Sequence, residues 1–413
     1  MSGSGAPLAP DPPWRIALGA QSILIQAAYA GIRIMIGYRA LELGADALFL
    51  GLLAASFAAP ALIAALPAGL FAGSLGGALL TTVGLVAMGV GAVVALLPTD
   101  SSWLLAVGCL LGVGFLASMI GQQTFVAQRN TGAHADGDFG TLSATASIGQ
   151  TVGPPLISTL VVLAVPGRPA AEPDTFVGIA IGLALLLAAV PVGFWLHRAD
   201  RAWRARRLPA RSATPAAEEG GRSLRRNVGL LSTPGVLPSL IVRGAVLVTM
   251  DLGYAFLPVW ANEHGVDASI LGWMLAVRAA VSVVGRIGLS RLVGRFGRRT
   301  LLVVSMAIGV AALVALPFAD VWGALAVMVA LGITLGIPPP VTLAWVVAIT
   351  RPSDHGAAVG LRMASNRLAQ VAIPIAVGAV AGAVGSAGIF WANAVLLGAA
   401  VGVVAVSDPD ARA

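Results

Sequence analysis

The sequence predicts an all-α membrane protein with twelve transmembrane helices in two six-helix bundles. Of its 413 residues, 58% are apolar and only 10% are charged, and the mean hydropathy is +0.90. Apolar stretches of about 20 residues, the length that spans a bilayer, recur along the whole chain. One long hydrophilic segment lies near the middle, with six apolar stretches on each side. This pattern excludes an ordinary soluble domain.

The predicted elements follow from the positions of the apolar stretches. A proline-rich tail, expected to be disordered and without the basic segment of a signal peptide, covers 1–14. The first bundle is predicted over 15–197, a linker over 198–235, the second bundle over 236–406 and a tail over 407–413. The spans are predicted at 16–38, 47–70, 75–97, 102–125, 139–164, 176–197, 236–261, 267–291, 300–318, 321–349, 355–382 and 387–406.

Arginines predict the orientation in the membrane. The central linker carries nine of them between Arg198 and Arg226, and arginine-rich loops stay on the cytoplasmic side. With the linker inside, Arg39 and Arg168 are the only arginines of the predicted loops and tails that lie outside. An even number of spans then places both termini in the cytoplasm. We expect a multi-pass protein of a bacterial inner membrane, surrounded by lipid and monomeric, and its basic charge gives no reason to expect nucleic-acid binding.

Three short glycine motifs occupy defined places in this scheme. Gly294-Arg295-Phe296-Gly297-Arg298-Arg299 lies between the eighth and ninth spans. The stretch 69–77, after the second span, keeps several glycines and has no charge. Gly149-x-x-x-Gly153-Pro154 lies in the fifth span.

Together with the arrangement of six helices, a basic linker and six more helices, these motifs resemble the major facilitator superfamily. The usual loop signature of that family is Asp-Arg-x-Gly-Arg-Arg, and Gly294 stands where the aspartate is expected. The loop after the second span is a degenerate copy. The resemblance implies a secondary transporter, and the fifth-span motif is similar to one associated with antiporters of the family.

Glycines and prolines predict where helices approach or bend. Small residues four apart, as at Gly149 and Gly153, let two helices pack closely, and Pro154 removes an amide donor. The run Pro338-Pro339-Pro340 leaves carbonyls unbonded in mid-membrane, which requires protein or a wet cavity beside it. We assign a gating or helix-bending role to these positions, with ordinary packing as the alternative.

Charged residues within spans are costly, by about 2.5–3.5 kcal/mol each on insertion scales, and need a reason. Seven such positions occur: Arg33, Arg243, Asp251, Arg278, Arg286, Arg362 and Arg367. Asp251, the sole acid among them, and Arg278 fall at similar depths in neighbouring spans, so a buried ion pair between them is geometrically possible. We assign proton coupling to Asp251 and Arg278, and a static structural pair is the alternative.

Polar positions predict the substrate cavity. Arg362, Asn366 and Gln370 share one face of the eleventh span, whereas Arg367 lies about 140° from Arg362. Arg286, near the inner boundary, is expected to reach out to lipid phosphate or to support the adjoining loop. The residues assigned to the cavity are Gln26, Tyr29, Arg33, Gln122, Gln150, Arg243, Arg362, Asn366 and Gln370. Hydrogen bonding between helices is the alternative role for them.

No pattern of an enzyme is found. The four histidines lie scattered without metal-ligand spacing, and the chain has no lysine for a Walker motif, so neither a metal nor a cofactor is expected. The predicted function is secondary transport of a small organic solute by alternating access, with proton-coupled export favoured. The alternative is uptake or exchange of an organic anion, because six arginines face one aspartate in the spans.

Overall fold

The computed structural model describes residues 14–60, 62, 76–97, 100–129, 135–169, 171–207, 229–351, 355–381, 386–407 and 409–410. This part of the chain is helical, with short connections and no β-strand. The predicted all-helical architecture is therefore confirmed. The tail before Trp14, residues 69–75 of the degenerate loop and most of the arginine-rich linker lie outside the described residues.

A first group of helices comprises α1 (Trp14–Glu42), α2 (Ala47–Ser56), α4 (Gly77–Ala95), α5 (Trp103–Arg129), α6 (Ala135–Ala164) and α7 (Thr175–Arg207). A second group comprises α9 (Val236–Glu263), α10 (Ala268–Val284), α11 (Leu289–Ala315), the 3-10 turn η1 (Leu316–Phe318), α12 (Val321–Gly336), α13 (Pro338–Ile349), α14 (His355–Ala381) and α15 (Ser386–Ala405).

Length and composition suit these helices to a bilayer. Among the described residues, eight helices are long and apolar enough to cross a membrane, and α2 and α10 are shorter apolar helices. The long helices α1 and α14 are not among those eight, and both carry polar and charged side chains within their length. Asp46 and Asp320 cap α2 and α12 by accepting hydrogen bonds from the backbone amides of Phe49 and Gly323.

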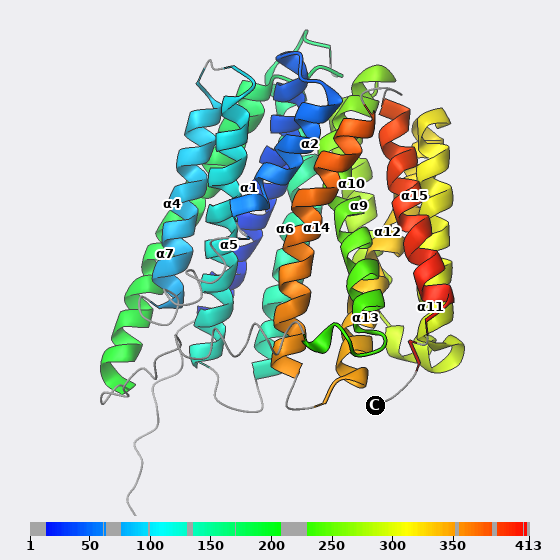
Figure 1. Ribbon diagram of the computed structural model, residues 1–413. Helices are drawn as coiled ribbons and strands as arrows, with labels where there is room; N and C mark the ends of the chain where they lie inside the picture. Colours follow the sequence, from blue (N-terminus) through cyan, green and yellow to red (C-terminus); the bar gives the residue numbers. More distant parts are fainter. Residues whose placement is uncertain are drawn as a thin grey trace, which may run out of the picture.

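Each group packs mainly within itself. In the first, α1 packs against α6 and α7, and α4 against α5 and α7; in the second, α9 packs against α14 and α15, and α11 against α12 and α15. Between the groups, α6 contacts α10, α2 contacts α14, and α1 and α2 contact α9. The two groups stand side by side, with α1 beginning and α15 ending at the lower end of Figure 1.

The contacts between the groups are close because glycines form them. A Cβ added to Gly51 of α2 would lie 2.4 Å from the carbonyl oxygen of Pro374 in α14. A Cβ added to Gly272 of α10 would lie 2.9 Å from the carbonyl oxygen of Pro154 in α6. On α1, a Cβ added to Gly37 would lie 3.3 Å from the Cγ of Pro258 in α9. All three contacts lie toward the end where α1 ends, so the groups are pressed together at the upper end of Figure 1.

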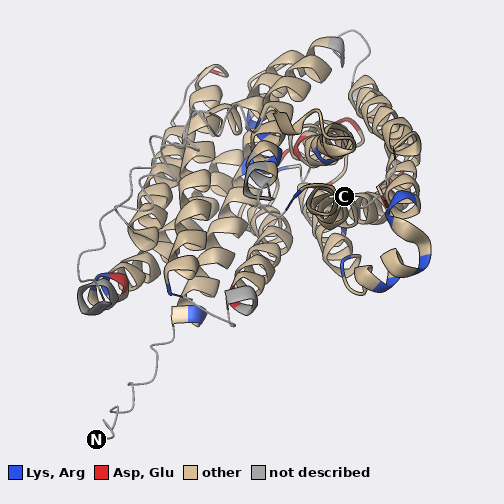
Figure 2. Ribbon diagram, turned by 60° about the horizontal axis from the view of Figure 1, so that its bottom comes forward, with Lys and Arg blue, Asp and Glu red and all other residues tan. Residues whose placement is uncertain are grey.

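Charged residues are confined to a few places on this scaffold. Figure 2 shows a ribbon that is mostly uncharged, with arginines and acids at helix ends and near the middle, where the two groups of helices meet. At the helix ends, Arg15 pairs with Asp138 at 2.7 Å, and Arg168 bridges Glu42 and Asp174. The ion-paired charges in the middle of the molecule are buried instead, and they belong to the site described next.

Candidate substrate cavity

An ion pair joins the two groups of helices in the middle of the molecule. Nη1 of Arg33, on α1, lies 3.0 Å from Oδ1 of Asp251, on α9. Both side chains are buried, with 8% and 5% of their surfaces exposed. Burying two charges is favourable only when they are paired and hydrogen-bonded. The pair therefore ties α1 to α9 in this state of the protein.

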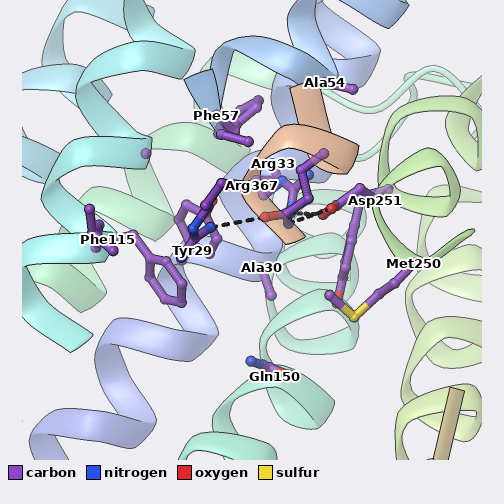
Figure 3. A pocket seen from close by; sticks show the side chains of 15 residues that line it. Tyr29, Ala30, Arg33, Ala54, Phe57, Phe115, Gln150, Met250, Asp251 and Arg367 are labelled. Atoms are coloured by element: carbon purple, nitrogen blue, oxygen red, sulfur yellow. Dashed lines mark hydrogen bonds and ion pairs between the residues drawn. The ribbon is translucent and has the colours of Figure 1, made fainter. Parts of the chain in front are cut away.

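The second carboxylate oxygen of Asp251 receives a hydrogen bond from α14. Nε2 of Gln370 donates to Oδ2 of Asp251 at 2.6 Å, and Nη1 of Arg367 donates to Oε1 of Gln370 at 3.0 Å. Figure 3 shows Arg33, Arg367 and Asp251 converging on one point. The resulting chain of polar contacts links α1, α9 and α14, so a change at Asp251 reaches three helices.

The partner of Asp251 in this structure is Arg33 and not Arg278, the arginine that the sequence suggested. Among the described residues no salt bridge joins Arg278 to an acid. Arg278 stacks instead on the ring of Tyr254, with its guanidinium carbon 5.0 Å from the ring centroid, and Arg33 lies at the same distance from that ring. Similar depth in neighbouring spans does not tell which helix face each side chain occupies.

A pocket with aromatic walls surrounds the ion pair. Its rings come from Tyr29, Phe57, Phe115 and Tyr254, and we call it the aromatic pocket. Arg33, Asp251, Arg367 and Gln370 also line it. Tyr29 and Phe115 stack in parallel, 3.9 Å between ring centroids, and Figure 3 shows them side by side. The pocket thus combines flat apolar surfaces with a charge cluster.

A second pocket adjoins the first. Its charged walls are Arg243, Arg278 and Arg286, and we call it the arginine pocket. Gln150, Met250 and Tyr254 line both pockets, so the two are neighbours. The space enclosed by the two pockets is about 90 and 120 Å³.

The arginine pocket has an excess of positive charge. No acid is among its described lining residues, and no salt bridge joins Arg243 or Arg286 to an acid of the described chain. Nε of Arg243 is buried without a hydrogen-bond partner, and Arg286 reaches only the hydroxyl of Ser282, at 3.4 Å. Arg286 is exposed and also lines this pocket. Guanidinium groups placed in this way attract an anion.

The other residues assigned to the cavity fall in different places. Tyr29, Gln150 and Gln370 line the aromatic pocket, and Gln26 accepts a hydrogen bond from Nε2 of Gln150 at 2.9 Å. Gln122 is buried within the first group of helices and lines neither pocket.

On α14 the expected order of importance is reversed. Arg367 lines the aromatic pocket, whereas Arg362 and Asn366 line neither of the two pockets. Nη2 of Arg362 donates to the carbonyl oxygen of Pro339 at 2.8 Å. Arg362 therefore binds a backbone carbonyl of the triple-proline segment, and a substrate role for it has no support in this geometry.

The triple proline marks a break in the tenth span. Helix α12 ends at Gly336 and α13 begins at Pro338, because three successive prolines give up three amide donors. Thr342 donates to the carbonyl oxygen of Pro338 at 2.8 Å, Pro339 lines the arginine pocket, and Pro340 is half-buried. The carbonyls freed by the missing donors are those of Thr334, Leu335 and Gly336, whereas Thr342 and Arg362 donate to carbonyls of the prolines themselves.

The fifth-span motif lies where three helices meet. A Cβ at Gly149 would lie 2.5 Å from the carbonyl oxygen of Ile23, and a Cβ at Gly153 would lie 2.3 Å from that of Ala27. The motif therefore packs α6 closely against α1. Pro154 follows on the side of α6 that contacts α10, in the second group of helices.

The loop motif of the second half has an unexpected partner. Gly297 has φ +76°, and the membrane-spanning part of α11 begins at Arg298. The backbone amides of Arg298 and Arg299 donate to the Asp410 carboxylate at 2.9 and 3.3 Å. An acid from the C-terminus thus caps the helix that follows the loop, which lacks an acid of its own because Gly294 replaces it. Arg295 stacks on Phe296.

In the part of the chain that the structure describes, no group of three or more His, Cys, Asp or Glu side chains could hold a metal ion. No curated protein matches the sequence.

Solved structures of transporters share the fold. The nucleoside transporter NupG superimposes with a TM-score of 0.73 at 13% identity, covering 95% of this chain and 97% of its own. The peptide transporter POT, in complex with sulfate, gives 0.68 at 12% identity, with 96% and 93% covered. A bacterial homologue of the human lysosomal transporter Spinster, inward-facing and occupied, gives 0.70 at 14% identity, with 95% of both chains covered.

A comparison of the sequence with family models shows the family to which the chain belongs. The model of the Major Facilitator Superfamily matches residues 18–255 and 240–413, which together cover nearly the whole chain. The expected resemblance is confirmed. The chain belongs to the major facilitator superfamily and is a multi-pass membrane transporter, not an enzyme.

Proposed function

We propose that this protein is a secondary transporter that carries a small organic anion by alternating access. The observation that carries the proposal is the arginine pocket, where Arg243, Arg278 and Arg286 meet no acid among the described lining residues. A buried cation without a partner is costly, and an anionic solute supplies the missing charge. We therefore favour an organic anion as the transported solute over the solutes of a drug exporter.

Alternating access needs two rigid halves that separate on one side at a time. We propose that the twelve spans form two six-helix bundles, 15–197 and 236–406, joined by the cytoplasmic linker 198–235. The glycine contacts of Gly37, Gly51 and Gly272 then close the outer side, and the Arg33–Asp251 pair lies beneath that closure. The proposed setting is a monomer in a bacterial inner membrane, with both termini in the cytoplasm.

Reporter fusions test this topology. A reporter active only in the cytoplasm, fused at Ala210, should give signal, and the same reporter at Ala171 should not. The reason is the retention of the arginine-rich linker on the inner side. Equal signals at the two sites would contradict the twelve-span arrangement.

A ligand screen tests the preference for anions. Purified protein is heated with benzoate, citrate, tetraphenylphosphonium or ethidium, because a bound ligand raises the melting temperature by mass action. The proposal expects stabilisation by at least one organic anion and by neither cation. Stabilisation by the cations alone would refute it.

Proton-driven export is the second candidate function. Asp251 favours it, because it is the one acid among the described residues that line the two pockets and it contacts both halves. Protonation of its carboxylate would release Arg33, and the close packing of Gly149 and Gly153 against α1 resembles the arrangement that the antiporter motif implies.

Reconstituted vesicles distinguish a role of Asp251 in proton coupling from a role in transport itself. The double variant Arg33→Gln/Asp251→Asn avoids a lone buried charge, so it should fold and exchange solute down its gradient. It should not accumulate solute in response to a pH gradient if Asp251 carries the proton. Full pH-driven accumulation by this variant would remove the coupling role from Asp251.

A further inference from the structure

The two pockets are neighbours with chemically different linings, and we treat them as two ends of one binding region. Gln150, Met250 and Tyr254 line both, so these side chains form the boundary that the aromatic pocket and the arginine pocket share. One end offers ring surfaces and the other offers cations. A molecule that occupies both ends must match each of them.

The aromatic end offers a flat surface. The rings of Tyr29 and Phe115 are nearly parallel, 5° apart, and both side chains are only half-buried, which leaves ring surface open to the pocket. Phe57 stands edge-on to Tyr29, with 6.2 Å between their centroids. Aromatic rings bind other flat rings in stacked or edge-to-face geometry, which favours a planar ligand over an aliphatic one.

The charges at the aromatic end are largely satisfied within the protein. Arg33 is neutralised by Asp251, and Arg367 has the amide oxygen of Gln370 as its acceptor. An anionic group of the ligand therefore gains little there and would compete with Asp251.

The charges at the arginine end are not satisfied. Arg278 is 3% exposed and rests on the ring of Tyr254, which fixes its position without neutralising it. Nε of Arg243 is buried without a hydrogen-bond partner. Guanidinium groups bind carboxylate and phosphate in charge-assisted, often bidentate hydrogen bonds, so the anionic group of a ligand belongs at this end.

We propose that the solute is a planar ring compound with one anionic group, whose ring packs against Tyr29 and Phe115 and whose carboxylate or phosphate binds Arg243 and Arg278. This rests on the proposed anion transport and narrows its substrate class. An aliphatic anion leaves the aromatic walls uncovered, and a ring-bearing cation places its charge beside three arginines.

The experiment measures dissociation constants by isothermal titration calorimetry on the purified full chain. Benzoate and phenyl phosphate carry both features, cyclohexanecarboxylate has a puckered ring, acetate has no ring and benzamide has no charge. At least one of benzoate and phenyl phosphate should bind about tenfold or more tightly than the three others. The stronger of the two tells which anionic group the site prefers.

Variants test which end binds the ring of the ligand and which end binds its anionic group. Arg278→Gln should weaken benzoate binding about tenfold or more, the size of a lost charge-assisted hydrogen bond. Phe115→Leu should bring benzoate down to the affinity of cyclohexanecarboxylate. Arg201→Gln, which removes an exposed arginine from α7, is the matched control and should change neither constant. Tyr29→Leu replaces Phe115→Leu if that variant does not elute as a single folded species.

The results that would refute the ring-anion substrate differ from those that would refute anion transport. Equal binding of benzoate, cyclohexanecarboxylate and acetate, or an unchanged benzoate constant in Phe115→Leu and Tyr29→Leu, overturns the ring while anion binding stands. Equal binding of benzamide and benzoate overturns the anionic group. If none of these ligands binds while tetraphenylphosphonium stabilises the protein, the proposed anion transport fails as well.

Discussion

Removing either residue of the Arg33–Asp251 pair should destabilise the protein strongly, because the remaining charge would be buried without its partner. At 3.0 Å and an effective dielectric constant of about 20, two unit charges attract each other by about 5 kcal/mol. Desolvation of both charges offsets part of this attraction in the intact pair, but removal of one partner leaves an uncompensated charge. Arg33→Gln and Asp251→Asn should therefore each lower the free energy of unfolding by about 3–5 kcal/mol.

The double variant should recover part of that loss. We expect a coupling energy of about 2 kcal/mol or more between the two positions, measured by equilibrium unfolding in mixed detergent micelles. The matched control is the cycle of Asp251→Asn with Arg278→Gln, which should give less than half of that coupling because Arg278 rests on Tyr254. Additive effects for Arg33 and Asp251, or a larger coupling for Arg278, would refute the assignment of the pair.

Three further predictions concern single positions. Arg278→Gln should raise the melting temperature of the ligand-free protein, because it removes a buried charge without an acidic partner, and a lower melting temperature would contradict the unsatisfied state of this pocket. Gly153→Ala should lower the melting temperature, since its Cβ would meet Ala27, while Gly89→Ala, which has open space around it, should not; equal effects would contradict the close contact of α6 with α1. Asp410→Ala should destabilise the protein by about 1 kcal/mol in chemical unfolding through the loss of a helix cap, and no change would show that the cap contributes nothing.

Helix content and family membership could be predicted from the sequence because they depend on local properties. Runs of apolar residues give the helices, and the fifth-span glycines give a close contact that Gly149 and Gly153 make with α1. Asp251 could likewise be singled out, because a lone acid among apolar residues needs a partner.

The identity of that partner could not be predicted. In a membrane protein both the lipid-facing and the core-facing sides of a helix are apolar, so periodicity does not tell how a helix is turned. Arg362 therefore looked like the cavity residue of α14, although Arg367 lines the pocket and Arg362 binds Pro339. For the same reason Arg278 was matched to Asp251 by depth alone.

The aromatic wall left little signal in the sequence. Phe57 and Phe115 are ordinary apolar residues of membrane spans, and only the fold brings them to Tyr29. Tyr254 was within reach of prediction, because it lies three residues after Asp251 on the same side of α9. The Asp410 cap joins segments that are 111 or more residues apart, which no local pattern reveals.

The central claim is that the cavity carries anions, and vesicle exchange tests it most directly. Vesicles with the reconstituted protein are loaded with unlabelled benzenesulfonate or phenyltrimethylammonium, two ring ions of fixed and opposite charge, and the entry of the same labelled ion is followed. The account predicts exchange of benzenesulfonate that is lost in Arg243→Gln/Arg278→Gln and kept in Arg201→Gln, with no exchange of the cation. Exchange of phenyltrimethylammonium without benzenesulfonate, or full benzenesulfonate exchange by the double variant, would contradict it.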